Sequence, residues 1–249
     1  MKGAKVRLYV DHPLGAGQSV PLSREQAHYL FGVMRLGVGD AVLLFNGHAG
    51  EWRVDVAEAG KRGGTLVCAE QTTPQHSPPD LWLLFAPIKK ARTDFIVEKA
   101  TELGAARICP VQTEFTNAER IRRDRLQAHA VEAAEQCGGT FVPPVEDIRK
   151  LSDMLTNWPA DRKLIFCDEA LAGPSFWSKY PGGRRQSRRG AEPPKAAILI
   201  GPEGGFSDAE RTRLRAMAET VSLGPRILRA DTAAVAAMAL WQAAEGDWQ

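Results

Sequence analysis

After residue 80 the chain alternates short apolar runs with segments of helical periodicity, and this alternation limits the fold more than any other feature. The apolar runs occupy residues 81–85, 107–111, 163–167, 196–200 and 220–223. Helical patterns lie at 93–103, 124–136, 147–157, 208–219 and 232–244. Continuous apolar strands that alternate with helices are typical of a parallel sheet that helices cover on both faces. The sequence therefore predicts an α/β domain.

The chain before residue 72 has a different pattern. Strand-like runs lie at 6–10, 41–45, 51–56 and 65–69, glycine turns separate them, and one helical stretch occupies 23–34. Several short strands with turn signals at this spacing predict a small β-barrel. The Pro-rich segment TTPQHSPPD at 72–80 is typical of a linker. We therefore expect two domains, at 1–73 and 78–249.

Composition is that of an ordinary soluble globular protein, with 44% apolar and 25% charged residues. A net charge of +2 does not by itself indicate a nucleic-acid partner, so local basic patches would have to bind one. No apolar run is long enough to span a bilayer, and residues 1–15 lack the apolar core of a signal peptide, so we expect a cytoplasmic protein without a membrane partner. The four cysteines form no C-x-x-C pair, which predicts no metal site and places Cys109 and Cys167 in the core.

A glycine-rich turn follows the apolar run 196–200. It reads Gly201-Pro202-Glu203-Gly204-Gly205, and Ser207 with Glu210 forms a capping box for a following helix. Glycine lets backbone approach a ligand closely, and ligands of open α/β sheets bind at the carboxyl ends of strands. A plain strand-to-helix connection explains the turn equally well when it is taken alone. A phosphate-binding turn is disfavoured because the Lys-Ser/Thr of a Walker loop is missing.

A second turn follows the last apolar run. Leu223-Gly224 precedes the basic segment Pro225–Arg229, after which Asp231 or Thr232 is expected to cap an alanine-rich helix. Small residues on several sides of this helix predict burial within the domain or at a subunit interface. Two glycine turns after neighbouring strands, without a metal cluster, fit a bent organic ligand.

These motifs together resemble the ribosomal small subunit methyltransferase E family, SPOUT-class enzymes that methylate N3 of a uridine in 16S ribosomal RNA. The resemblance runs nearly end to end and rests on six parts in order. They are VMRL at 33–36 with GD at 39–40, FNG at 45–47, EKATELG at 98–104, EAAEQ at 132–136, IGPEGGF at 200–206 and LGPRILR at 223–229.

The family implies a PUA-like RNA-binding barrel followed by a SPOUT-type parallel sheet with a C-terminal trefoil knot. It also implies a homodimer with the last helix near its interface, S-adenosylmethionine (SAM) as the cofactor, no metal, and 16S rRNA or the small ribosomal subunit as the partner. The cofactor would lie against the loops 167–170, 201–205 and 223–228. The residues expected to bind it are Asp168, Gly201, Pro202, Glu203, Gly204, Gly205, Leu223, Gly224, Arg226, Ile227 and Leu228.

Transfer of a methyl group from a sulfonium to uridine N3 needs orientation and loss of the N3 proton. We expect Arg229 to steady the uridine anion or its phosphate, and Asp231 to orient Arg229 or accept the proton, with Glu203 as a second candidate for either role. A structural salt bridge of Arg229 is an equally open interpretation. The RNA contacts expected from exposed cations are Arg7, Arg24, Arg35, Lys89, Lys90, Arg92, Arg122 and Arg123.

Two positions depart from the family pattern, which commonly has a glutamate at Asp231 and an arginine at Gly139. The basic segment 184–189 resembles an insertion that could compensate for the second change. Three alternatives stay open at this point: a SPOUT enzyme that acts on another RNA or atom, a non-catalytic RNA-binding protein of the same fold, and a nucleotide-binding α/β protein.

Overall fold

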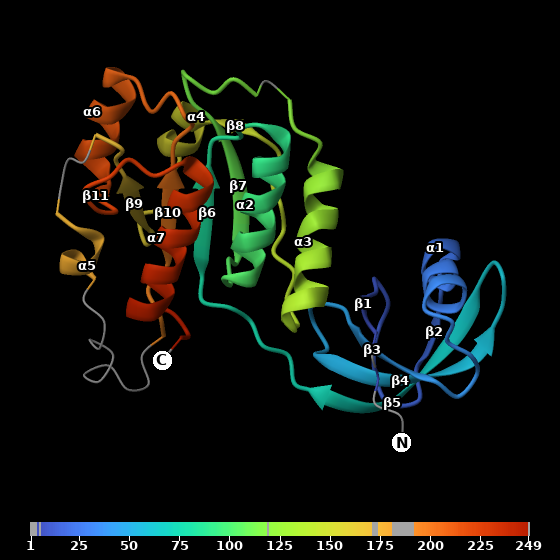
Figure 1. The fold of residues 1–249 in the computed structure, drawn as a ribbon. Coiled ribbons are helices and arrows are strands. Elements are labelled where there is room, and N and C mark those ends of the chain that lie inside the picture. Colours follow the sequence, from blue (N-terminus) through green and yellow to red (C-terminus); the bar gives the residue numbers. More distant parts are fainter. Residues whose placement is uncertain (1–3, 5, 119, 171–173, 181–191, 249) are drawn as a thin grey trace. The chain divides into compact units, whose positions relative to one another are not determined.

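The computed structural model describes residues 4, 6–118, 120–170, 174–180 and 192–248, so the basic segment 184–189 lies outside the described residues. The chain divides into two compact units. Unit 1 comprises Met1–Ser77 and Ala134–Val142, and unit 2 comprises Pro78–Ala133 and Pro143–Gln249. Each unit has its own sheet and its own core (Figure 1).

Unit 1 is built on a curled five-stranded sheet in the order β1-β3-β4-β5-β2. Only β1 and β3 pair in parallel. Register shifts interrupt the pairing of β4 with β5, and such bulges increase the twist that lets a small sheet curl around its core. The strands are β1 Arg7–Tyr9, β2 Ser19–Pro21, β3 Ala41–Phe45, β4 Glu51–Ala59 and β5 Gly64–Thr73.

The helical stretch expected at 23–34 is only partly an α-helix. Ser23 and Gln26 form a capping box for α1, Arg24–Ala27, and the chain then continues as a π-helix, η1, His28–Val33. Ala27 and Leu30 face the core of unit 1. Both α- and π-turns bring residues three to five apart onto one face, so apolar spacing cannot tell them apart.

Unit 2 contains a six-stranded sheet in the order β11-β9-β10-β6-β7-β8, in which every pair is parallel, as the alternating pattern predicts. The strands are β6 Leu81–Phe85, β7 Arg107–Gln112, β8 Arg149–Lys150, β9 Lys163–Cys167, β10 Ala196–Ile200 and β11 Glu219–Val221. The helices are α2 Lys90–Glu102, α3 Arg123–Cys137, α4 Leu151–Thr156, α5 Phe176–Lys179, α6 Asp208–Met217 and α7 Ala230–Ala244. The last turn of α3 belongs to unit 1.

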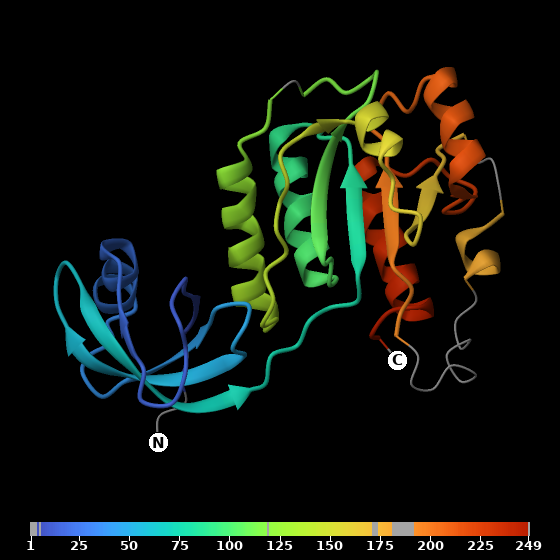
Figure 2. The same ribbon diagram turned by 180° about the vertical axis from the view of Figure 1, so that it is seen from behind.

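Helices cover both faces of this sheet, with α2 and α7 on one side and α4 and α6 on the other (Figures 1 and 2). Alternate strand residues such as Phe166 and Leu199 pack with Leu151 of α4 and Leu214 of α6. Trp241 of α7 is fully buried on the opposite side. A strand residue and its neighbour point to opposite faces, so continuous apolar runs are required here.

Three expected helix starts are wrong. The helix expected from 93 begins three residues earlier, at Lys90. The helix expected from 147 begins at Leu151, because Arg149 and Lys150 pair with the end of β7 as the edge strand β8. The last helix begins at Ala230 with Arg229 at its N-cap, and no side chain caps it, so neither Asp231 nor Thr232 has the expected capping role. Among the described helices, none is long and apolar enough to cross a lipid bilayer.

Candidate functional site

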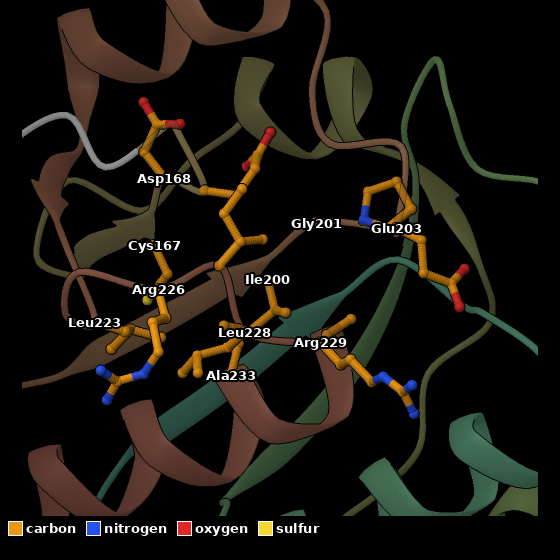
Figure 3. A pocket seen from close by; sticks show the side chains of 14 residues that line it. Cys167, Asp168, Ile200, Gly201, Glu203, Leu223, Arg226, Leu228, Arg229 and Ala233 are labelled. Atoms are coloured by element: carbon orange, nitrogen blue, oxygen red, sulfur yellow. The ribbon is translucent and has the colours of Figure 1, made fainter.

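Three loops at the carboxyl edge of the unit 2 sheet enclose a cavity of about 230 Å³. They follow β9, β10 and β11, and these strands lie side by side in the sheet, which brings the three loops together. The cavity is lined by Cys167, Asp168, Glu169, Ile200, Gly201, Pro202, Glu203, Leu223, Arg226, Ile227, Leu228, Arg229, Ala230 and Ala233 (Figure 3). Of the residues expected to bind a cofactor, Gly204, Gly205 and Gly224 are not in its lining.

The loop after β10 has the geometry that its glycines allow. A Cβ atom at Gly201 would lie 2.5 Å from the Phe206 ring, and one at Gly205, where φ is 72°, would collide with the Glu169 carboxylate. Ser207 and Glu210 then form the predicted capping box at the start of α6. Larger residues at 201 or 205 would therefore displace this wall of the cavity.

An arginine on α6 ties the first two loops together. The Arg211 guanidinium contacts Asp168 at 2.5 Å, the Glu169 carboxylate and, at 3.0 Å, the Phe206 carbonyl. Arg215 contacts the other Asp168 oxygen at 2.7 Å, and the Asp168 side chain is fully buried. We call Arg211 together with Asp168, Glu169 and the Phe206 carbonyl the arginine clamp. Asp168 thus lies at the cavity as expected, but its carboxylate is engaged by α6.

Sequence reasoning missed the arginine clamp. The signal that could have shown it is the spacing of Arg211 and Arg215, which puts two guanidinium groups on one face of α6 directly after the capping box. Two arginines on one helix face favour carboxylate partners, and the pair Asp168 and Glu169 follows a predicted strand.

The loop after β11 contributes apolar side chains and two free cations. Gly224 has φ of 117°, and its N–H is 3.3 Å from the Ser222 hydroxyl. Leu223 and Leu228 line the cavity, while Ile227 remains 75% exposed. Neither Arg226 nor Arg229 forms an ion pair with any residue that the structure describes.

The three expected catalytic residues do not form one group. Arg229 and Glu203 both line the cavity and point toward the same side of it (Figure 3). Asp231 does not line the cavity, and its carboxylate lies 3.6 Å from the guanidinium of Arg92 on α2. Within the described chain, Asp231 therefore pairs with Arg92, and it has no contact that would orient Arg229.

The lining suits an organic ligand that has both apolar and polar parts. Ile200, Leu223, Leu228 and Ala233 supply apolar surface, while backbone groups of the glycine loop and exposed charges supply polar partners. Burial raises the pKa of the Cys167 thiol to about 12, so this lining residue stays protonated and is no nucleophile. No group of three metal-ligating side chains occurs among residues that the structure describes.

The cations expected to bind RNA differ in their surroundings. Arg7 is engaged inside unit 1, where it contacts Glu51 at 2.6 Å, the Ala134 carbonyl at 2.5 Å and the Gly139 carbonyl at 2.7 Å. Arg24, Arg35, Lys89 and Lys90 are exposed, and no described residue pairs with them. Arg122 pairs with Asp124 at 2.5 Å, and Arg123 donates to the Val145 carbonyl at 2.7 Å.

Comparison with known proteins gives matches over both units. Residues 75–242 match the RNA methyltransferase domain family, and residues 22–67 match the RNA methyltransferase PUA domain, so the curled sheet of unit 1 is PUA-like. The ribosomal RNA small subunit methyltransferase E of Synechocystis is 31% identical over 226 residues, which cover 89% of this chain and 72% of the relative.

Two solved structures share the fold. The ribosomal RNA small subunit methyltransferase E of Neisseria gonorrhoeae, bound to SAM, is 28% identical with a TM-score of 0.84, covering 98% of this chain and 99% of that one. A protein of Legionella pneumophila, in complex with SAM, is 30% identical with a TM-score of 0.83, covering 97% and 98%. The chain belongs to the ribosomal RNA small subunit methyltransferase E family.

Proposed function

We propose that this protein is a SAM-dependent rRNA methyltransferase that methylates N3 of a uridine in the 16S rRNA of the small ribosomal subunit. The observation that carries the proposal is the cavity of three loops at the sheet edge, with Arg229, which pairs with no described residue, on its rim. Its relatives are named ribosomal RNA small subunit methyltransferase E, and two structures of the same fold hold SAM.

The cavity residues fit SAM, which would supply an activated methyl group on its sulfonium. Backbone groups of Gly201, Pro202 and Glu203 would hydrogen-bond its polar parts, and Leu223 and Leu228 would pack on its adenine. The other residues that we propose to bind the cofactor belong to the same loops and are Gly204, Gly205, Gly224, Arg226 and Ile227. Asp168 acts indirectly, because the arginine clamp holds its carboxylate and thereby fixes the first loop.

The acceptor side of the site needs a positive group and a proton acceptor. Uridine N3 becomes a strong nucleophile only when its proton leaves, and it lies on the Watson–Crick edge, so the base must be unpaired. We assign stabilisation of the uracil anion to Arg229, whose guanidinium is exposed. We assign proton acceptance to Glu203, which lines the same cavity, whereas Asp231 is engaged by Arg92 and supports the contact between α2 and α7.

Exposed cations along the carboxyl edge of unit 2 would hold the RNA backbone near this site. Lys89 and Lys90 at the start of α2 and Arg122 before α3 are exposed, and Arg24 and Arg35 are exposed on unit 1. Phosphate contacts position RNA without reading its sequence, and each one makes affinity fall with salt. We do not assign Arg7, Arg92 and Arg123 to RNA binding, because Arg7 and Arg123 form structural hydrogen bonds and Arg92 forms an ion pair.

A homodimer and a trefoil knot belong to the same proposal. The face of α7 that is turned away from the core keeps four apolar residues partly exposed, which supports a subunit contact there. They are Val235, Ala236, Ala239 and Leu240. Light scattering at micromolar concentration tests the dimer, and a mass near 27.2 kDa would contradict it.

Substitution of Arg229 tests the catalytic assignment. We expect R229A to bind SAM within threefold of wild type by isothermal titration, because the side chain lies at the rim. Its rate of methyl transfer to small ribosomal subunits should fall by about a hundredfold, the usual loss for one group that stabilises an oxyanion. R213A is the matched control, since the one side-chain hydrogen bond of Arg213 to a described residue goes to the Thr156 hydroxyl at 3.0 Å.

Three outcomes would count against parts of this proposal. Full turnover by R229A would refute the role of Arg229, and full turnover by E203Q would refute proton acceptance by Glu203. SAM binding without methyl transfer to any small-subunit RNA by the wild-type protein would refute the substrate.

A further inference from the structure

Unit 1 carries a cavity of its own, of about 460 Å³, between the helical segment and the turn that joins β4 to β5. His28, Phe31 and Gly32 line it from the helical side, and Gly60 and Lys61 line it from the turn. We call it the helix–turn pocket. His28, Gly32, Gly60 and Lys61 are exposed, so the pocket is open to solvent.

Two aromatic rings of this pocket lie against bare backbone. A Cβ atom at Gly32 would be 3.0 Å from Nδ1 of His28, and one at Gly64 would be 2.6 Å from Cε2 of Phe31. Glycine at these positions therefore lets each ring approach the backbone closely. Phe31 packs on the core of unit 1, whereas the His28 imidazole has no hydrogen bond or ion pair with a residue that the structure describes.

The backbone beside the pocket is irregular. His28–Val33 is a π-helix, and Arg35, with φ of 56°, is the only non-glycine residue of the described chain with a positive φ. Both conformations cost free energy and persist mainly where function needs them. The core of unit 1 explains Leu30 and Phe31 of η1, whereas Val33 of η1 is 58% exposed and the nearby Val38 is 69% exposed.

The charge around the pocket is positive. Arg24 and Arg35 flank the helical segment, and Lys61 with Arg62 forms the tip of the turn. All four are exposed, and none forms an ion pair with a residue that the structure describes. The nearby acids, Glu25 and Glu58, are fewer, so the surface attracts a polyanion.

We propose that the helix–turn pocket binds one unpaired nucleobase of the RNA substrate, with its flanking phosphates on Arg24, Arg35 and Lys61. The inference rests on the proposed function for the identity of the RNA. Unpaired bases stack on aromatic and histidine rings, whereas a duplex hides its base faces and offers mainly phosphates. A pocket lined by aromatic side chains, with exposed cations beside it, therefore fits a single-stranded RNA segment.

The test compares binding of the full-length protein to a fluorescent single-stranded RNA and to a duplex of the same sequence, by anisotropy. We expect H28A to weaken single-strand binding roughly tenfold, the typical loss of one stacked base, and to change duplex binding less than twofold. K61A should weaken the binding of both RNAs and make their affinity less dependent on salt concentration.

Two glycine substitutions, one beside His28 and one away from it, test the contribution of the His28 ring separately from other effects. In G32A the new methyl group would lie 3.0 Å from Nδ1 of His28 and would shift the ring by a few tenths of an ångström, so we expect a loss in the same direction as in H28A but smaller. In G37A the methyl group meets nothing within 4 Å, so affinity should stay at the wild-type value. Circular dichroism melting of both variants shows that folding is intact.

Two results overturn the proposal: wild-type affinity of H28A and G32A for single-stranded RNA, or equal loss for the single strand and the duplex. SAM affinity, measured by titration on the same samples, should be unchanged in every variant. If the wild-type protein methylates no rRNA while H28A still loses single-strand binding, the pocket stands and the proposed function fails.

Discussion

Replacing Arg211 with methionine should weaken cofactor binding, although Arg211 lines no part of the cavity. Its guanidinium joins the loop after β9 to the loop after β10 through Asp168, Glu169 and the Phe206 carbonyl. Methionine keeps most of the side-chain volume and removes all of these bonds. Arg215 would still hold the loop after β9, and the Phe206 N–H, 3.2 Å from the Glu169 carboxylate, would be left as the described bond between the two loops.

The contacts set the size of the effect. Loss of one partner from a buried ion pair costs about 3–5 kcal/mol, and the Arg211 side chain is only 18% exposed. Asp168 keeps Arg215 at 2.7 Å and the Ala170 N–H at 3.0 Å, and Glu169 is 29% exposed and can be hydrated. We therefore expect the free energy of unfolding to fall by about 2–3 kcal/mol. SAM affinity should fall about tenfold, or about 1.4 kcal/mol.

Isothermal titration with SAM and urea unfolding measure the two quantities on the same samples. R213M is the control, because Arg213 lies on the same helix and bonds only the Thr156 hydroxyl. D168N tests the clamp from the other side, since the amide keeps the shape, removes the carboxylate that Arg215 contacts and leaves Arg211 with Glu169 alone. If R211M unfolds more easily yet binds SAM within twofold of wild type, the clamp is purely structural and this reasoning is refuted.

Three further changes have definite expected results. At pH 8, iodoacetamide should alkylate exposed Cys137 and leave Cys167 unmodified, because burial raises the pKa of the Cys167 thiol to about 12. Peptide mass spectrometry measures the labelling of each cysteine, and rapid labelling of Cys167 would contradict the expectation. Q242L should lower the free energy of unfolding by about 1–3 kcal/mol, because the buried amide donates at 2.7 Å to the carbonyl of Leu103 after α2; wild-type stability in urea would contradict this. G205A should weaken SAM binding in titration, because a φ of 72° strains any residue that carries a Cβ atom and the Glu169 carboxylate would have to move; wild-type affinity would contradict this.

The central strands of unit 2 could be predicted because their signal is local. The runs 81–85, 163–167 and 196–200 are continuous and apolar, and the structure has strands with these bounds. The edge strand β8 has no such signal, since Arg149 and Lys150 are exposed and extended only through pairing with β7. The π-helix shares its apolar spacing with an α-helix.

In the candidate site, too, features with a local sequence signal could be predicted, and contacts between distant residues could not. The glycine loops are predictable because the turn residues and the capping box lie within ten residues of one another. The pairs Arg211 with Asp168 and Arg92 with Asp231 join residues far apart in the sequence. Only the packing of α6 against β9, and of α2 against α7, brings them together. The place of Arg229 at the cavity could therefore be predicted from the sequence, whereas the partner of Asp231 could not.

The chemical identity of the methylated nucleoside tests the central claim most directly. Small ribosomal subunits from a strain that lacks this gene would be incubated with the protein and with SAM labelled in its methyl group, and nucleosides would be separated by mass spectrometry. The account predicts labelled 3-methyluridine at one site of 16S rRNA, and at least a hundredfold less with R229A. Label on a ribose oxygen, on uracil carbon or on another RNA would contradict the account, even if SAM binds.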